Sequence, residues 1–579
     1  MSRNDEVADR LEEFADLLEA RDIEYKPRAY RDAAENVRDY PVAIEGLVAD
    51  GQDAVANIDA VGEAISAKIV EYIETGEIEE LERLRAELPV EMDALTRVEG
   101  VGPKTVGRLY EALSVQTLDD LEAAAEAGEI RDLKGFGEKT EQNILDGIPF
   151  ARESHGRELL AHALPRADRV EGFLSSLSMV EAVELAGSIR RRKPTVGDVD
   201  VLVGSEDPEA VVAAFTDWEA PERVLEAGTG KATVRLDNVR VDLRVVAPDE
   251  FGAALQYFTG SKRHNVSIRN RAIDRDLKVN EYGVFDVSAV TDPDAGQRVG
   301  ERVAGHDENG VYRALDLTWI PPELRENRGE IEAAANGDLP TLVTPEDIRG
   351  DLHLHTTWSD GAASVAEMVA AAEAFGHEYV AITDHATGPG MVGGVGLDDE
   401  EIREQMTEIR TVADDTDIGV FAGIEANIDT EGDISVGDDV LAELDLVVAS
   451  PHAGLDGDGT ERLVRAASHP SVDIIGHPTG RQLNRRAGMT VDIERLAVAA
   501  VDHGTALEIN AHPRRLDLRG QAVQTAIKTG ATIAINTDAH ATASYEHLRY
   551  GVDTARRGWA EAPDILNTHT VDDLRSFLD

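Results

Sequence analysis

The sequence predicts a multidomain protein with an α-helical N-terminal region, a central α+β region and a C-terminal α/β barrel. Three observations predict this fold class. The chain has 579 residues, more than one hydrophobic core usually serves. A glycine-containing helix–turn pattern recurs three times before residue 150. Finally, seven apolar strand-like runs, near residues 352, 379, 420, 446, 473, 507 and 533, alternate with helical stretches, which is typical of a closed barrel of parallel strands.

The composition limits the chemistry and the location of the protein. The chain contains no cysteine, so any metal must be held by His, Asp and Glu. No run of about eighteen apolar residues occurs, so no membrane-spanning helix is expected. The charged, amphipathic start lacks the order of a signal peptide, and we therefore expect a cytoplasmic protein.

The charge balance is strongly acidic. Lys and Arg total 57, Asp and Glu total 113, and only ten of the cations are lysines. Such a balance normally argues against a nucleic-acid partner, because attraction to phosphate supplies most non-specific affinity. A lysine-poor acidic surface is also what we expect of a protein from a cytoplasm filled with molar salt, where the Debye length is about 3 Å. Composition does not choose between these interpretations.

The three N-terminal repeats indicate binding to a DNA backbone. Each places glycine in a turn before a helix, at Gly62, at Gly100 and Gly102, and at Gly135 and Gly137. Glycine permits the tight turn, and the following helix presents N–H groups to an anion. The pattern resembles the helix-hairpin-helix motif, which grips one DNA strand by its phosphates. Plain helix packing is the alternative, and the first copy has Ala60 where glycine is usual.

Three aspartates in the central region predict a nucleotidyltransferase. Asp198 and Asp200 lie two apart in a strand expected over residues 196–203, and Asp242 lies in a second strand over residues 239–245. Carboxylates on adjacent strands can hold two divalent ions for in-line phosphoryl transfer. Upstream, Gly187 and Ser188 precede a basic run suited to a triphosphate. The alternative for Asp-x-Asp alone is a solvated strand edge.

At this point the chain resembles the palm and thumb of family X DNA polymerases. The resemblance is carried by residues 186–191, 197–200, 257–261 and 280–282. It implies two Mg²⁺ or Mn²⁺ ions on the three aspartates, with Asp242 nearest the attacking 3′-hydroxyl. The nucleotide contacts implied are Gly187, Ser188, Arg191, Gly197, Tyr257, Phe258, Gly260 and Asn265, and Arg240 and Arg269 join the hairpin glycines as DNA contacts. Val196 replaces a serine of animal relatives, so one phosphate contact is expected to be missing.

The N-terminal region resembles the small lyase domain of the same family. Lys68 stands at the position of the lysine that forms a Schiff base while removing a 5′-deoxyribose phosphate, and Tyr30 also matches. Such a lysine must be unprotonated to attack. Ala64 replaces a phosphate-holding lysine, and the alternative is that Lys68 is a helix-face charge near DNA.

A second constellation follows the strand-like runs of the C-terminal region. Its members are His353, His355, Asp360, His385, Glu425, His452, His477, Asp538 and His540. In a barrel of parallel strands the C-terminal strand ends converge on one face. A single such histidine is more often a satisfied polar residue, but nine groups at one end predict a metal centre. Imidazole and carboxylate ligands suit Zn²⁺, Mn²⁺ or Fe²⁺ better than Mg²⁺.

These motifs resemble the PHP (polymerase and histidinol phosphatase) domain that follows many bacterial and archaeal family X polymerases. The resemblance implies up to three metals and a Mn²⁺-favouring phosphoesterase. The implied activities are a 3′–5′ exonuclease, removal of 3′-phosphates and incision at abasic sites. Arg514 or Arg515 is expected either to contact substrate phosphate or to be a surface charge.

Together these patterns predict a monomeric repair enzyme acting on gapped or nicked DNA with deoxynucleoside triphosphates. The expected domains are a helical lyase-like domain (1–85), helix-hairpin-helix fingers (86–150), palm (151–250), thumb (251–318), linker (319–348) and PHP domain (349–579). Residues 321–345 are expected to form an exposed connector.

Three alternatives remain at the level of sequence. The chain could be a non-enzymatic DNA scaffold, although two complete sets of metal ligands argue against it. The front half could modify RNA or a small molecule, and the back half could hydrolyse a small phosphomonoester such as histidinol phosphate.

Overall fold

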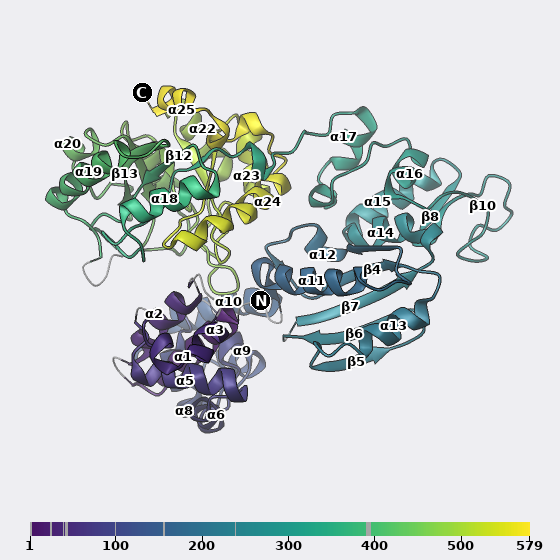
Figure 1. The fold of residues 1–579 in the computed structure, drawn as a ribbon, viewed down its shortest axis with the longest axis horizontal. Helices are drawn as coiled ribbons and strands as arrows, with labels where there is room; N and C mark the ends of the chain where they lie inside the picture. The colour runs from purple at the N-terminus through teal and green to yellow at the C-terminus, as the bar shows by residue number, and fades with distance from the viewer. Residues whose placement is uncertain are drawn as a thin grey trace.

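The computed structural model consists of a helical bundle, a mixed sheet with an appended helical region, and a barrel (Figure 1). It describes residues 3–578 except 24, 25, 39, 41–43, 59, 99, 155, 156, 238 and 390–394. No helix in this described part has the length and apolarity needed to cross a bilayer.

The N-terminal bundle is built from short helices around one buried apolar cluster. Its helices are α1 (Asn4–Ala20), α2 (Lys26–Arg38), α3 (Ile44–Asp50), α4 (Gln52–Val55), α5 (Glu63–Thr75), α6 (Glu79–Glu87), α7 (Met92–Leu95), α8 (Pro103–Leu113), α9 (Leu118–Glu126) and α10 (Glu138–Ser154). Gly62 and Gly102 directly precede α5 and α8. Gly100 has φ +79° and Ala60 has φ +57°, so Ala60 adopts the left-handed conformation that its glycine counterpart takes more easily.

The palm is a five-stranded mixed sheet in the order β2-β4-β7-β6-β5. Its elements are β1 (Glu158–Leu159), α11 (Leu160–Ser175), β2 (Ala182–Leu185), α12 (Gly187–Arg190), β3 (Thr195–Val196), β4 (Val199–Gly204), α13 (Pro208–Thr216), β5 (Arg223–Ala227), β6 (Lys231–Leu236) and β7 (Val239–Val246). The strand expected over 196–203 is interrupted, because Asp198 lies in a bend before β4. Strands β4 and β7 are parallel, and their register sets Asp200 beside Asp242.

The thumb follows the palm and surrounds a separate apolar cluster. Its elements are α14 (Phe251–Thr259), α15 (Lys262–Ile273), β8 (Leu277–Asn280), β9 (Gly283–Asp286), β10 (Glu301–Ala304), α16 (Glu308–Ala314) and α17 (Glu330–Asn336). The three strands form one antiparallel sheet.

The expectation of an exposed connector over residues 321–345 is wrong. Arg325 and Glu330 in this segment have no exposed surface, and Leu324 and Ile331 belong to the thumb cluster. Arg325 donates to Glu308 with both terminal nitrogens, and Glu308 also accepts from Arg190 of the palm at 2.8 Å. The charged residues of this segment therefore belong to a buried ion network, because they pair with charges on other elements.

Seven parallel strands in sequence order form the C-terminal barrel, as predicted. Its elements are β11 (Gly350–Asp351), α18 (Val365–Phe375), β12 (Tyr379–Ile382), α19 (Asp399–Ala413), β13 (Gly419–Asn427), α20 (Asp438–Leu441), β14 (Leu446–Ser450), α21 (Thr460–Ala467), β15 (Ile474–Ile475), α22 (Ile493–His503), β16 (Ala506–Asn510), α23 (Gly520–Thr529), β17 (Ile533–Asn536), α24 (Leu548–Arg557) and α25 (Val571–Leu578). A parallel bridge between Leu354 and Ala539 brings the first and last strands together.

Replacing the shared carboxylate, Glu308→Gln, should destabilise the palm–thumb unit. The change leaves the buried guanidinium of Arg325 and the half-buried one of Arg190 without this counter-charge, which costs about 3–5 kcal/mol. Despite burial, Arg325 and Arg190 lower the pKa of Glu308 from 4.5 to about 2, so its stabilisation is complete above pH 4.5 and is lost as the pH falls toward 2. Urea unfolding followed by tryptophan fluorescence measures the change, since the indole of Trp319 donates to Glu308.

The matched control is Asp249→Asn, which removes an exposed ion pair with Arg302. That pair should be worth less than about 1 kcal/mol. Equal destabilisation by the two substitutions would contradict the importance of the buried network.

Candidate active sites

Three carboxylates converge at the edge of the palm sheet. Oxygen atoms of Asp198, Asp200 and Asp242 lie within 4.8 Å of one another. Burial, followed by the charges of the other two, raises the pKa of Asp200 to about 7, and burial also raises the pKa of Asp198. Like charges this close favour a bound cation over the empty ionised state, so the donor set fits divalent metal.

Close contact requires glycine at the turn beneath these carboxylates. Gly187 has φ +59°, and a Cβ added there would lie 1.8 Å from Oδ2 of Asp200. The turn backbone therefore packs directly against a candidate metal ligand. Ser188 follows in the first turn of α12, and its predicted contact with the triphosphate stays a prediction.

Two neighbouring side chains in the sheet donate hydrogen bonds to the carboxylate of Asp242. Thr233, its cross-strand partner on β6, donates its hydroxyl to Asp242. Arg240 donates to the same carboxylate at 2.9 Å. The predicted DNA contact Arg240 thus engages a candidate metal ligand in this structure. Thr233 was missed, because nothing in a strand's sequence specifies which residue pairs with it.

The remaining nucleotide candidates lie on or beside α14 and α15. Phe258 lines a cavity of about 220 Å³ together with Asp200 and Asp242, which we call the palm cavity. Tyr257 packs edge-on against Phe258 at 5.2 Å. The amide of Asn265 donates to the backbone carbonyls of Tyr257 and Gly260, so it shapes the turn between the two helices.

Arginines predicted to bind phosphate have different environments. Arg191 is buried and donates to Glu326 at 2.9 Å and to the carbonyl of Thr259 at 2.7 Å. Arg269 is exposed on α15. Gly197 is exposed beside Asp198, at the predicted position.

Lys68 lies in a partly buried site on α5. Its ammonium pairs with Glu80 at 2.7 Å and lies over the ring of Phe14. Burial by itself lowers the pKa of Lys68, but the hydrogen bond to Glu80 and the charge of Tyr30 outweigh burial, and the pKa is raised. The side chain is therefore held as the ammonium, the form that does not attack a carbonyl.

All nine residues predicted for the barrel centre are brought together at one end of the strands. Glu425 lies at the middle, 3.0 Å from Nε2 of His477, 3.3 Å from Nε2 of His353 and 3.4 Å from Nε2 of His452. His355 is 3.1 Å from Asp538, and Asp360 is 3.3 Å from His540 and 3.5 Å from His385.

Six buried ligand atoms in this centre make no hydrogen bond within the described part of the chain, although three of them, on His353, His385 and His452, lie in ion-pair contact with Glu425. They are His353 Nε2, His355 Nδ1, His385 Nδ1, Glu425 Oε2, His452 Nε2 and His477 Nδ1. A buried polar atom without a partner costs about 1–3 kcal/mol, and several facing one centre are unusual. Burial and the neighbouring His540 and His385 lower the pKa of His355, whereas, despite burial, Glu425 raises the pKa of His385 and Asp360 that of His540, each to about 10. The donor set therefore fits metal.

A second ring of side chains orients these ligands. Glu508 lies 2.8 Å from Nδ1 of His353, and the Oδ1 of Asn427 lies 2.7 Å from Nδ1 of His452. Asn510 donates to Asp538 at 2.9 Å. Such partners fix the tautomer of a ligating histidine. Sequence reasoning missed all three, although a glutamate inside the apolar run of β16 was a signal that could have found Glu508.

A cavity of about 400 Å³, which we call the barrel pocket, opens onto this centre. Arg515 lines it with its guanidinium 3.5 Å from Asp538. Arg514 also lines it but pairs with Glu12 of α1 at 3.3 Å. Of the two arginines considered from sequence, Arg515 is the one adjacent to the metal-ligand set.

Comparisons with known proteins identify several of the domains. Family models match for a helix-hairpin-helix domain (residues 2–78), a SAM-like helix-hairpin-helix tandem (92–148), the DNA polymerase beta thumb (254–326) and the PHP domain (351–512). These matches define a family X polymerase architecture joined to a PHP domain.

The relatives identify the family more closely. The chain is 34% identical to DNA polymerase/3′-5′ exonuclease PolX of Bacillus subtilis (strain 168) over 98% of each chain. It is 24% identical to DNA polymerase lambda of Rattus norvegicus over 55% of this chain and 56% of the relative. A probable phosphatase of Shewanella sp. (strain MR-4) is 33% identical over 33% of this chain and 75% of the relative. The chain belongs to the PolX family.

Introducing a methyl group at the palm turn, Gly187→Ala, should abolish nucleotide addition. The Cβ would displace Asp200, and misplacing a reacting group by about 1 Å can cost a hundredfold in rate. Primer extension measures this, and hydrolysis of a small phosphodiester should be unchanged. The control is Gly172→Ala on α11, where an added Cβ meets nothing within 4 Å. Normal extension by Gly187→Ala would contradict the role of the turn.

Removing the carboxylate beside Lys68, by Glu80→Gln, should increase Schiff-base formation with a 5′-deoxyribose phosphate. Loss of the ion pair lowers the pKa of Lys68, and each pKa unit raises the neutral fraction about tenfold near neutral pH. Borohydride trapping on incised abasic DNA measures the adduct, whose yield should also rise with pH.

Glu82→Gln on the same helix is the control, because Glu82 pairs with Arg85 instead. Lys68→Ala should abolish trapping. Undiminished trapping in that variant would assign the chemistry to another amine.

Proposed function

We propose that this protein fills short gaps in DNA at the palm and trims or cleans 3′ ends at the barrel, in base excision repair. The observation that carries the proposal is the pair of separate ligand sets, three carboxylates in one domain and nine groups in another. The partly unsatisfied barrel ligands also argue against a non-enzymatic scaffold, since buried unpaired donors persist where they serve a function.

In the palm, Asp198, Asp200 and Asp242 would hold two Mg²⁺ or Mn²⁺ ions. When bound, these ions neutralise charge that develops during phosphoryl transfer. Asp242, oriented by Thr233 and Arg240, is the group we place nearest the primer 3′-hydroxyl. The backbone of Gly187 and Ser188 would receive the triphosphate, and Tyr257 and Phe258 the sugar and base.

In the barrel, the nine ligands would hold up to three Mn²⁺, Zn²⁺ or Fe²⁺ ions. When bound, such ions polarise a phosphoester and lower the pKa of attacking water. Arg515 would bind the non-bridging phosphate oxygens, with Glu508, Asn427 and Asn510 keeping the ligands aligned. The same chemistry serves exonucleolytic cleavage, removal of a 3′-phosphate and incision at an abasic site.

Separate active sites predict separable losses. On one-nucleotide-gapped DNA with Mn²⁺, Asp198→Ala should reduce extension at least about a hundredfold and spare trimming, and His355→Ala should do the reverse. Gel analysis of a labelled primer, with and without deoxynucleotides, measures both. Loss of both activities in either variant would count against independent sites.

The same assay tests the remaining expectations about substrate and salt. The acidic composition predicts activity in molar KCl, and a preference for dilute buffer would contradict it. Templated choice among the four deoxynucleotides separates a DNA polymerase from an RNA-tailing enzyme. Equal turnover of histidinol phosphate and a DNA 3′-phosphate would favour the small phosphomonoester.

A further inference from the structure

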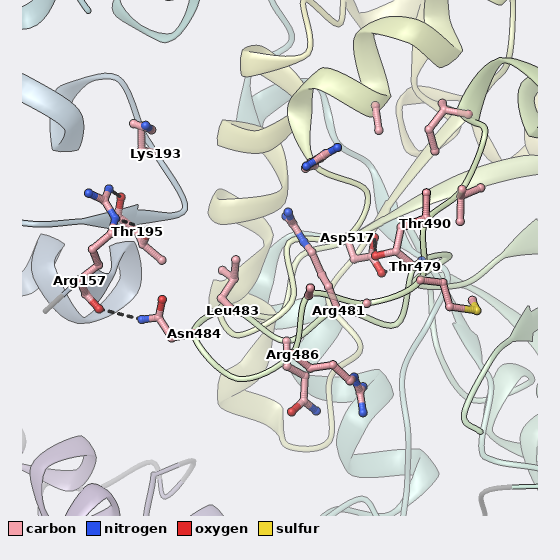
Figure 2. A pocket seen from close by; sticks show the side chains of 18 residues that line it. Arg157, Lys193, Thr195, Thr479, Arg481, Leu483, Asn484, Arg486, Thr490 and Asp517 are labelled. Atoms are coloured by element: carbon pink, nitrogen blue, oxygen red, sulfur yellow. Dashed lines mark hydrogen bonds between the residues drawn. The ribbon is translucent and has the colours of Figure 1, made fainter. Parts of the chain in front are cut away.

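A positively charged pocket lies between the palm and the barrel, outside both ligand sets. It has a volume of about 550 Å³. Figure 2 shows Arg157, Lys193 and Thr195 of the palm on one side, facing Arg481, Arg486 and neighbouring barrel residues on the other. We call it the interdomain pocket. The side chain of Asn484 ties its two walls together by donating to the carbonyl of Arg157 at 2.7 Å.

The charge of this pocket is opposite to that of the chain. Its lining contains five cationic side chains, Arg157, Lys193, Arg481, Arg486 and Arg519, and one carboxylate, Asp517. The protein as a whole carries a net charge of −56 and only ten lysines. A concentration of positive charge in a concave site on an acidic protein focuses the field on an anionic ligand.

Two of these cations lack an anionic partner in the described part of the chain. No hydrogen bond or ion pair within it involves the Lys193 ammonium or the Arg519 guanidinium. Burial lowers the pKa of Lys193, and the charges of Arg191, Arg557 and Arg157 lower it further against the single opposing charge of Glu326. Placing cations together in this way is unfavourable unless an anion joins them.

The residues that line the interdomain pocket favour the phosphates of a single strand over bases or a duplex. None of the described lining residues is aromatic, so bases have no stacking platform there and recognition falls on the backbone. The volume is that of a small-molecule site, which admits a nucleotide or two of one strand but no duplex.

The interdomain pocket lies close to residues of both active sites. On the palm side, a guanidinium nitrogen of Arg157 lies 3.8 Å from the position that a Cβ of Gly197 would take. The positive charge of Arg157 also lowers the pKa of Asp198, against the larger effect of burial. On the barrel side, Gln482 lines both this pocket and the barrel pocket. Arg481 donates to the carbonyl of Arg515 at 2.9 Å, directly behind the guanidinium that approaches Asp538.

We propose that the interdomain pocket binds the phosphates of a single DNA strand whose 3′ end reaches from the palm to the barrel centre. The inference rests on the proposed function, since it needs both sites to act on one strand. The pocket serves as the route for an unpaired 3′ end and takes no part in bond making or breaking.

The test uses the full chain with Lys193→Gln and Arg519→Gln combined. The control combines Lys528→Gln and Arg575→Gln, which removes two barrel cations that line none of these pockets. Trimming of an unpaired 3′ end on primed DNA should fall at least about tenfold, since charge-assisted contacts are lost. Its log–log salt slope should decrease by about 1.4, at about 0.7 per single-strand phosphate. Hydrolysis of the p-nitrophenyl ester of thymidine 5′-phosphate should stay within about twofold of the wild type.

Trimming unchanged in the pocket variant, or reduced equally in the control, would overturn the proposal. Loss of ester hydrolysis would also overturn it, because the damage would then lie at the barrel centre itself. Failure of trimming and extension in the wild type would instead refute the proposed function.

Photocrosslinking distinguishes the source of the phosphate. A 4-thiothymidine in the unpaired end should label residues 481–486 in the wild type and not in the pocket variant. Labelling of that peptide by 8-azido-dATP alone would make a free nucleotide the occupant and overturn the DNA assignment.

Discussion

Close packing of ionisable side chains in buried sites is the constraint on which both candidate centres depend. Asp198, Asp200 and Asp242 lie within 4.8 Å of one another, and burial, followed by the charges of the other two aspartates, raises the pKa of Asp200 to about 7. In the barrel, the histidines surround Glu425, and several of their nitrogens make no hydrogen bond in the described structure. Both arrangements favour the binding of cations, and neighbouring side chains hold the ligands in position.

Direct contacts between the palm and the barrel position the two candidate centres relative to each other. Arg557 of the barrel donates to the backbone carbonyl of Arg191 and lies 3.5 Å from Glu326. Leu516 and Tyr550 of the barrel belong to the apolar cluster of the palm. The palm turn and the barrel are therefore packed against each other through both apolar and charged contacts, and the interdomain pocket lies within a contact that the domains already share.

The residues that could be located from sequence are those with a strong periodic or positional signal. His353 and His355 follow directly after β11, and most of the other barrel ligands follow apolar runs, so convergence at one end follows from parallel-strand geometry. The same reasoning gave a wrong prediction for residues 321–345, because Glu330 and Arg325 resemble exposed loop residues when their partners are not known. Burial of a charged side chain depends on a counter-charge distant in sequence, as Glu308 is for both Arg190 and Arg325.

The sequence by itself determined the fold class, the seven-stranded barrel and the choice of the twelve acidic and imidazole side chains as candidate ligands, since each depends on local periodicity or on residue type. Only the tertiary structure decided that Thr233 and Glu508 orient those ligands, that Glu80 holds Lys68 protonated, and that Lys193 faces the barrel. These outcomes depend on which elements pack together. Such contacts join residues far apart in the chain, and no local pattern encodes them.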